Sequence, residues 1–400
     1  MHGNIIQLQQ YYKCKLPYFD VMNYGAVGDG KPMIRRYHLC AMHVQAFLKA
    51  WNETCKVQQQ HATLNIPAKT FLLNPIQFSG PCVPTSINVQ IGLFIFIDFS
   101  TGSSKIIAST NKSLFSNNHW LLFSYVKGLT LTGSGTIDGQ GAGSWQERRD
   151  TSRIDTYQSP KAHIILTKCD GANINNITIS APEAAPNTTL LAQTMFKFGT
   201  PKLEQVLFRS VLALQLHTFS CDDCIAISAR CSFINITSVT CGPGHGISIG
   251  SLGDPGSGDF DTVSEVHVRS CNFTGRNTTG VRIKTWQGEV KKITYEDIMF
   301  DNVRYPIVID QFYCPNNASK TIGTSALAIS DVLYTRITGT SSGDEVISLN
   351  CGTRNSCNNI VLDDIHLKSS DPTKTAYAHC LNVNGRASNV EPSADQCMHS

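Results

Sequence analysis

Charged residues are scarce in this chain of 400 residues: Asp, Glu, Lys and Arg together make up 16%, and the formal net charge is +3. A balance this mild does not indicate nucleic-acid binding, although it would not repel a polyanion. Long apolar runs are also lacking. The run Ile91–Phe99 is too short to span a bilayer and predicts a buried strand instead. We expect no nucleic-acid partner and no membrane partner.

The first thirteen residues lack the apolar core of a signal peptide, so either the exported protein starts upstream or the chain is not exported. Cysteine pairs with zinc-site spacing are lacking too, and we expect no metal and no cofactor. The fifteen cysteines instead indicate an oxidising compartment with several disulfides. Glycosylation signals of the form N-x-[ST] agree with this, at Asn52, Asn111, Asn176, Asn187, Asn235, Asn272, Asn277 and Asn317.

What the chain does contain is typical of strands and tight turns. Hydrophobic residues make up 41%, there are 30 glycines, and Ile, Val, Thr, Ser and Asn are abundant. The segment Val44–Trp51, continuing to Cys55, predicts a short amphipathic helix that would cap the N-terminal end. From Ala62 onward nearly every segment predicts a short strand.

Similar strands recur through the second half, about 27 to 39 residues apart. One set has the pattern of N-I-T-I, at 172–179, 233–240, 265–273, 292–300 and 359–367; a second set has the pattern I-x-I, at 246–249, 280–283, 306–309 and 345–349. One such coil cannot bury its apolar face alone, whereas stacked coils can. A β-sandwich also has many short strands. The recurring I-x-I phase favours an all-β, right-handed parallel β-helix.

Chemistry-bearing residues lie at the starts of successive I-x-I strands. Asp222 and Asp223 precede one, His245 precedes the next, and Arg282 and Lys284 alternate with apolar residues in the third. Equivalent residues of neighbouring coils lie about 4.8 Å apart, so these five should form one patch, with Val281 and Ile283 pointing inward. Two carboxylates, a histidine and two cations suit glycoside hydrolysis of an acidic sugar. Taken singly, each motif is more typical of a turn, a structural calcium ligand or a solvated strand.

The sequence resembles the plant polygalacturonases of glycoside hydrolase family 28 over most of residues 18–387. The matching motifs are D-D-C-I-A-I-S at 222–228, C-G-P-G-H-G-I-S-I-G-S-L-G at 241–253, G-V-R-I-K-T-W-Q-G at 280–288 and I-D-Q-F-Y-C-P at 309–315. The resemblance implies a right-handed parallel β-helix that hydrolyses pectin with inversion. It implies that Asp222 is the general acid, that Asp223 helps to hold the attacking water and that His245 supports the acid. The implied galacturonate-binding residues are Arg282, Lys284 and Tyr313.

Three blocks depart from the family pattern. The family's N-T-D motif is replaced by A-P-N-T-T at 185–189, so Asn187 matches as a substrate-binding residue but Thr189 occupies the place of an aspartate that shares the water. In the same block, the segment Leu190–Ser220 does not show the alternation of a strand; residues 32–43 replace a short link of the family, and the tail after Ala387 diverges as well. The sequence therefore predicts either a weakened pectin-cleaving hydrolase or a non-catalytic β-helix that still binds pectin through Arg282, Lys284 and Tyr313, or has a structural role in the cell wall.

The expected organisation is a divergent segment, 1–17, followed by one β-helix domain, 18–400, interrupted near 32–43 and 189–220. We expect a monomer, secreted to the cell wall, that meets pectin as its polysaccharide partner. Proximity suggests the cysteine pairs Cys55–Cys82, Cys224–Cys241, Cys351–Cys357 and Cys380–Cys397, and the resemblance also favours the second of them. Fifteen is odd, and the resemblance implies that Cys40, Cys221 and Cys231 lie where the family has no cysteine, so at least one of them should stay unpaired.

Overall fold

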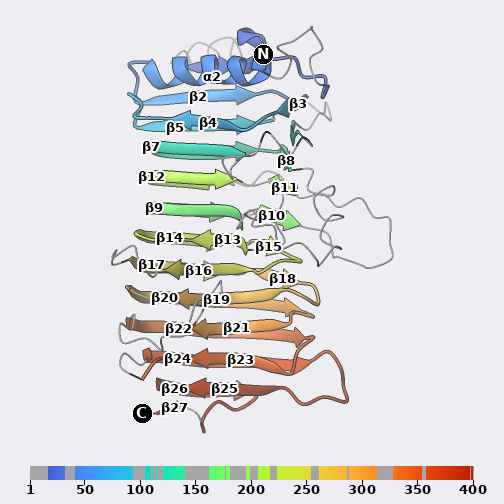
Figure 1. The fold of residues 1–400 in the computed structure, drawn as a ribbon, viewed down its shortest axis with the longest axis vertical. Helices are drawn as coiled ribbons and strands as arrows, with labels where there is room; N and C mark the ends of the chain where they lie inside the picture. Colours follow the sequence, from blue (N-terminus) through green and yellow to red (C-terminus); the bar gives the residue numbers. More distant parts are fainter. Residues whose placement is uncertain are drawn as a thin grey trace, which may run out of the picture.

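The computed structural model describes residues 17–31, 41–92, 104–109, 111, 114, 120–139, 162–175, 177–180, 195–198, 206–216, 223–253, 261–285, 288–312, 328–353, 357–396 and 398–399. In these residues the chain winds into a stack of short coils, with the N-terminal helix at one end and the C-terminal strand at the other (Figure 1). Neighbouring coils pair almost entirely in parallel, as predicted for a right-handed parallel β-helix.

The stack has three faces. The first face is formed by β1 (Tyr18–Asp20), β2 (His61–Ile66), β5 (Ser86–Ile91), β14 (Cys231–Thr237), β17 (Thr262–Arg269), β26 (Val383–Glu391) and β27 (Met398–His399). The second is formed by β4 (Ile76–Ser79), β13 (Asp223–Ile227), β16 (Ile247–Leu252), β19 (Thr279–Thr285), β21 (Tyr305–Asp310), β23 (Glu345–Asn350) and β25 (Tyr377–Leu381). The third is formed by β3 (Thr70–Leu73), β6 (Lys105–Ala108), β8 (Thr136–Asp138), β10 (Ile177–Ser180), β15 (Thr240–Cys241) and β18 (Asn272–Thr274).

Five long strands bend around a corner and serve two faces. They are β7 (Leu121–Gly133), β9 (Ala162–Asn175), β20 (Glu289–Asp301), β22 (Ala328–Ser341) and β24 (Cys357–Ser369). The bends are made by left-handed residues that stack in register: Asp297, Arg336 and Asp364 have φ of 54°, 52° and 55°. Asp tolerates this conformation better than most residues, and the repeated corner keeps successive coils aligned.

The core follows from alternation along each strand. In β19 the side chains of Val281 and Ile283 are fully buried, as predicted, and they stack on Ile247 and Ile249 of the coil before and Ile307 and Ile309 of the coil after. Burying one such aliphatic side chain contributes about 1.5–3 kcal/mol. The repeated I-x-I pattern is therefore both the signal for the fold and its main source of stability, and the predicted strands at 246–249, 280–283, 306–309 and 345–349 are confirmed.

The predicted N-terminal helix is confirmed as α2 (Ala41–Lys56), which begins three residues earlier than the pattern indicated. It covers the first coils: Phe47 packs edge-on against Phe71 at 5.5 Å, and the Trp51 ring lies 5.3 Å from Phe78. The Trp51 indole donates to the Ser79 carbonyl at 3.0 Å. The helix thus covers apolar side chains that have no further coil above them. No helix in the described part of the chain is long and apolar enough to cross a membrane.

One prediction about strands was wrong. Within Leu190–Ser220, which matches no strand phase, the chain forms β11 (Met195–Phe198) and β12 (Val206–Leu216). Both strands pair antiparallel to their neighbours, β11 between β8 and β10 and β12 between β7 and β9. Because both strands run antiparallel to their neighbours, the repeating pattern of the parallel strands does not predict them. Of the predicted strand Ile91–Phe99, only Ile91 and Gly92 lie within the described residues. Ile91 is the last residue of β5.

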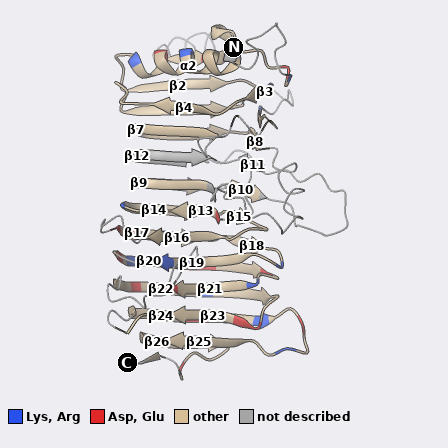
Figure 2. Cartoon of the chain, viewed as in Figure 1, with Lys and Arg blue, Asp and Glu red and all other residues tan. Residues whose placement is uncertain are grey.

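Charged residues occupy little of the ribbon (Figure 2). Several lie at the bends, where they pair between coils: Lys292 Nζ is 2.7 Å from Glu265, and Arg336 contacts both Glu296 and Asp297. These side chains are largely exposed, and pairs of that kind contribute little to stability in water. A different kind of charge cluster, almost fully buried, lies on the second face.

Candidate active site

The second face brings together residues from three consecutive coils. Strands β13, β16 and β19 pair in parallel, with Ala226, Ser248 and Arg282 in register. Asp223 is the first residue of β13, as predicted for a residue at the mouth of a strand. Residues 59 and 61 positions apart in the sequence, Arg282 and Lys284 with Asp223, therefore meet at one place.

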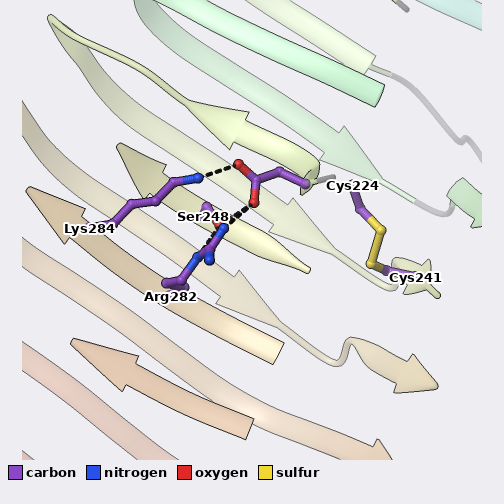
Figure 3. Close-up of polar contacts among 6 residues, drawn as sticks. Cys224, Cys241, Ser248, Arg282 and Lys284 are labelled. Atoms are coloured by element: carbon purple, nitrogen blue, oxygen red, sulfur yellow. Dashed lines mark hydrogen bonds and ion pairs between the residues drawn. A yellow bond between two sulfur atoms is a disulfide. The ribbon is translucent and has the colours of Figure 1, made fainter. Parts of the chain in front are cut away.

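The centre of the site is the Asp223 carboxylate. Oδ1 accepts hydrogen bonds from Ser248 Oγ at 2.6 Å and from Arg282 Nη2 at 2.8 Å, while Oδ2 accepts from Lys284 Nζ at 2.8 Å (Figure 3). Asp223 is 1% exposed and Lys284 is 5% exposed. Asp223, Ser248, Arg282 and Lys284 together form the Asp223 cluster.

Because the cluster is largely buried, its charged groups need close partners of opposite charge. Removing charges from water costs several kcal/mol per ion, and this cost is offset only where opposite charges and hydrogen bonds meet closely. Asp223 has such contacts with two cations at 2.8 Å each. Arg282 and Lys284 thus place two positive charges beside the Asp223 carboxylate, and positive charges in a poorly solvated place attract an anionic group.

Ser248 was part of a predicted motif, but sequence analysis assigned it no role. Its hydroxyl donates to Asp223 Oδ1 and accepts from Arg282 Nε at 3.1 Å, so it joins the carboxylate to the guanidinium. The side chain is fully buried. A signal was present in the sequence: Ser248 lies between the inward-pointing Ile247 and Ile249, and so alternation places it on the outer side of the strand.

The loop that carries His245 is held against the start of β13. The Gly246 carbonyl accepts from the Cys224 amide at 2.8 Å, and the Gly244 carbonyl accepts from the Thr279 amide at 3.0 Å. Gly246 has φ of +70°, and a Cβ on it would lie 1.8 Å from the Gly280 carbonyl oxygen. Only glycine fits there. His245, half-buried, is therefore placed by a tightly constrained backbone beside the strand that begins with Asp223.

A disulfide reinforces the same junction. Cys224, next to Asp223, is bonded to Cys241 at the start of the His245 loop, as predicted (Figure 3). The predicted pairs Cys55–Cys82 and Cys351–Cys357 are also confirmed. Cys380 is disulfide-bonded, and Cys397, its predicted partner, lies outside the described residues.

Three cysteines in the described residues are free: Cys169, Cys231 and Cys271. Cys231 was one of the three predicted candidates for an unpaired thiol, while Cys40 and Cys221 lie outside the described residues. Burial raises the pKa of Cys231 and that of Cys271 to about 12, and it raises the pKa of Cys169 as well. Buried thiols that stay protonated are poor nucleophiles, so these three side chains act as core residues.

Asp310 adds a second carboxyl one coil beyond the cluster. It ends β21, in register with Lys284 of β19, and is half-buried. Burial raises its pKa above the ordinary value of an aspartate. The Phe312 amide, which donates to Asp310 Oδ1 at 2.9 Å, and the nearby Arg282 guanidinium oppose that shift. Sequence analysis quoted Asp310 only as part of the I-D-Q-F-Y-C-P motif and gave it no role.

Several predicted site residues lie outside the described residues: Asp222, Asn187 and Tyr313, together with Thr189. Their positions relative to the Asp223 cluster stay predictions. Within the described part of the chain, no three His, Cys, Asp or Glu side chains are grouped in the manner of metal ligands.

Comparisons with known proteins agree with this architecture. Residues 55–181 and 149–391 match the model of glycosyl hydrolases family 28. The chain is 34% identical over 401 residues to a protein of Arabidopsis thaliana named as a probable polygalacturonase, covering 95% of this chain and 80% of that protein. It is 35% identical over 398 residues to a polygalacturonase of Cryptomeria japonica, covering 92% of this chain and 69% of that protein. Among solved structures, the endo-xylogalacturonan hydrolase of Aspergillus tubingensis matches with a TM-score of 0.57 and 16% identity, over 92% of this chain and 96% of the other.

Proposed function

Because the chain belongs to glycosyl hydrolases family 28, we propose that it acts on pectin, hydrolysing the α-1,4 bonds between galacturonosyl residues. One observation carries the proposal: the Asp223 cluster, in which a buried carboxylate, a hydroxyl and two cations meet on three consecutive coils. Its two cations, Arg282 and Lys284, suit a sugar that carries a carboxylate, because a guanidinium and an ammonium both form strong hydrogen bonds with that group.

The proposed roles follow the family pattern, residue by residue. Asp222 donates a proton to the leaving glycosidic oxygen, and His245 supports its protonation state. Asp223 helps to hold the water that attacks the opposite face of the ring. An inverting reaction needs about 6.5–9.5 Å between the carboxyl groups to leave room for that water. Arg282 and Lys284, with Tyr313 and Asn187, bind the galacturonate carboxylate and hydroxyls.

The geometry of Asp223 supports a role as a water holder rather than as an acid. Both carboxylate oxygens of Asp223 accept hydrogen bonds from cationic side chains at 2.8 Å, so this residue acts as an acceptor in the site. An ionised carboxylate accepts hydrogen bonds only, including one from a water. The loop backbone and the Cys224–Cys241 disulfide keep His245 beside the start of β13, where the acid is proposed.

A second candidate function is binding of pectin without cleavage, and Thr189 favours it. The family's second water-holding aspartate has no counterpart at this position, and a loss of general-base assistance typically lowers the rate 10²–10⁴-fold. In this form of the proposal, Arg282, Lys284 and Tyr313 still bind the polysaccharide, and the role is structural, in the cell wall.

Release of reducing ends from polygalacturonate distinguishes the two functions. Hydrolysis by the chain as it stands, lost in Asp223→Asn at a temperature where circular dichroism shows that this variant is still folded, would establish the enzyme and exclude the binding-only role. If the chain is inert and Thr189→Asp produces hydrolysis, the binding-only role holds and the missing carboxylate is its cause. Proton NMR of the newly formed anomer checks inversion. If neither chain cleaves nor binds polygalacturonate, both forms of the proposal are wrong.

We further propose that the protein is secreted and acts as a monomer in the cell wall. The disulfides Cys55–Cys82, Cys224–Cys241 and Cys351–Cys357, together with exposed sequons such as those at Asn52, Asn235 and Asn272, support passage through an oxidising secretory compartment. Expression of the full-length chain in plant cells, followed by glycosidase treatment and blotting of the wall fraction, tests this. A protein found only in the cytosol, without glycans, would contradict it.

A further inference from the structure

The second face continues beyond the Asp223 cluster toward the C-terminal end of the stack. Strands β19, β21, β23 and β25 follow one another along this face and pair in parallel (Figure 1). The cluster takes its residues from β13, β16 and β19, so the site itself extends along the stack. A polysaccharide that crosses the cluster in this direction next meets β21, which lies one coil spacing, about 4.8 Å, beyond β19.

Two side chains of β21 lie beside the two cations of the cluster. Val308 is in register with Arg282, and Asp310 is in register with Lys284. The residues on either side of Val308 are fully buried, so alternation places Val308 and Asp310 on the outer side of β21. Both are half-buried. They therefore form the outer surface that directly adjoins the cations.

The cations themselves are directed away from β21. Arg282 Nη2 and Lys284 Nζ both contact the carboxylate of Asp223, which begins β13, two coils toward the N-terminal end (Figure 3). The positive charge of the site is thus held on the N-terminal side of β19. On the C-terminal side, the first outward groups are an apolar side chain and a carboxyl group.

The coils that follow bring no positive charge to this surface. The described strands β21, β23 and β25 contain no lysine or arginine. Ser348 and Asn350 of β23 are in register with Val308 and Asp310, and His379 of β25 is in register with Ser348. Hydroxyl and amide groups hydrogen-bond to sugars whether or not the sugar is charged. The cationic part of this surface therefore ends at β19.

The charged residues nearest in sequence lie at the other end of these strands. Arg304 precedes β21, six residues before Asp310, and its guanidinium lies over the ring of Tyr305 at 5.2 Å. Glu345, an acid, begins β23. Neither residue places a cation in register with Val308 or Asp310.

This arrangement distinguishes a charged sugar unit from an uncharged one. A free galacturonate beside Asp310 would bring two carboxylates together, and like charges that meet at a binding surface oppose binding. A methyl ester removes the charge of the sugar. It also adds a methyl group that can pack on Val308, and burial of apolar surface is favourable. Two neighbouring coils thus have opposite preferences, β19 for a carboxylate and β21 for an uncharged unit.

We propose that the chain binds partly methyl-esterified pectin, with a free galacturonate at the Asp223 cluster and a methyl-esterified unit next to it, over Val308 and Asp310. These two residues form the β21 subsite. The proposal rests on the proposed function, because it requires that the cluster binds galacturonate. Val308 and Asp310 determine specificity and take no part in breaking the bond.

Three short ligands test the preference. They are unesterified trigalacturonate and two trigalacturonates with a single methyl ester, on the unit at the reducing end or on the unit at the other end. Calorimetry at pH 7, well above the ordinary pKa of an aspartate, measures their affinities. We expect one ester to bind about threefold more tightly than the unesterified ligand, because a repulsion between partly exposed charges is removed. The other ester should gain nothing, since its methyl group lies away from the β21 subsite.

Variants of the β21 subsite should change this ratio of affinities. Asp310→Asn should raise the affinity for the unesterified ligand about threefold and so remove the preference. Val308→Thr, which keeps the volume and the branched Cβ, should lower the affinity for the favoured ester about threefold relative to the unesterified ligand, since an apolar contact is lost. The matched control is Asp301→Asn, the same charge change at an exposed aspartate that pairs with the third face; it should leave the ratio unchanged. Circular dichroism checks that each variant is folded.

The outcomes separate this proposal from the proposed function. If the unesterified ligand binds as tightly as both esters, or if the preference persists in Asp310→Asn, the β21 subsite does not select an ester, although the chain still binds galacturonan. If none of the three ligands binds, the proposed function itself is wrong, and the β21 subsite is wrong with it.

Discussion

Ser248 and Arg282 occupy the same register position on adjacent coils, and the serine hydroxyl accepts a hydrogen bond from Arg282 Nε at 3.1 Å. The same hydroxyl donates to Asp223 at 2.6 Å, and Arg282 Nη2 contacts the same carboxylate oxygen at 2.8 Å. Three side chains from three coils thus close a small ring of hydrogen bonds. The orientation of the guanidinium is therefore set by a neutral residue as well as by a charged one.

Removing this hydroxyl should affect binding as well as stability. We expect Ser248→Ala to lower the free energy of unfolding by about 1–3 kcal/mol, since buried charged groups lose a partner. Affinity for trigalacturonate should fall about tenfold or more, measured by calorimetry. Ser251→Ala is the matched control, because Ser251 is the exposed serine of the same strand; it should change neither quantity. Unchanged binding in Ser248→Ala would show that the serine does not orient Arg282 for substrate.

Neutralising Asp223 should destabilise the fold strongly. In Asp223→Asn, the buried Lys284 and the partly buried Arg282 lose their shared counter-charge, and breaking a buried ion pair costs about 3–5 kcal/mol. Urea unfolding followed by tryptophan fluorescence measures the loss. Glu289→Gln provides the comparison: its pair with Lys291 is half-exposed, so its removal should cost less than about 1 kcal/mol. If both variants lost the same free energy of unfolding, burial of the Asp223 cluster would contribute nothing to the strength of its ion pairs.

The raised pKa of Asp310 should be visible in the pH dependence of stability. Its folded-state pKa is raised, chiefly by burial, so the folded protein binds this proton more tightly than the unfolded chain does. Stability from this group is therefore present below the unfolded pKa and is lost as the pH rises through the folded pKa.

Asp310→Asn removes that titration. Relative to the unmodified chain, the variant should gain stability as the pH rises from 3 to 7, measured by thermal unfolding at fixed ionic strength. Asp371→Asn is the opposite control: Thr373 and Lys374 lower the pKa of this exposed aspartate, so its removal should forfeit stability as the pH rises. If stability changed with pH in the same direction in both variants, the pKa of Asp310 would not be raised in the folded protein.

Loss of the Cys224–Cys241 disulfide next to the site should lower stability more than loss of the Cys351–Cys357 disulfide near the C-terminal end. Cys224 and Cys241 are 17 residues apart, while Cys351 and Cys357 are 6 apart. In the chain-entropy model, the losses on replacement by alanines are about 3 and about 2 kcal/mol. Only the first replacement should also lower activity or binding, because it loosens the junction between β13 and the His245 loop. An equal effect of both on binding would exclude that positioning role.

The repeated strands were predictable because their signal is local. In each I-x-I segment, burial alternates with a period of two, and this alternation is written in adjacent residues. The proximity of Asp223 to Arg282 and Lys284 was also predictable, since a constant coil spacing converts sequence separation into proximity. The sequence analysis expected both cations to meet a substrate carboxylate. In the structure they meet Asp223, a contact between coils that no single segment contains.

What the sequence by itself determined is the coil: its strands, its inward isoleucines, its helical cap and the order of the site motifs. Only the tertiary structure decided which side chains pair across coils, that Ser248 joins Arg282 to Asp223, and that β12 lies antiparallel between β7 and β9. The physical reason is the same in each case. Alternation is a property of one strand, whereas register and insertion depend on partners far away in the chain.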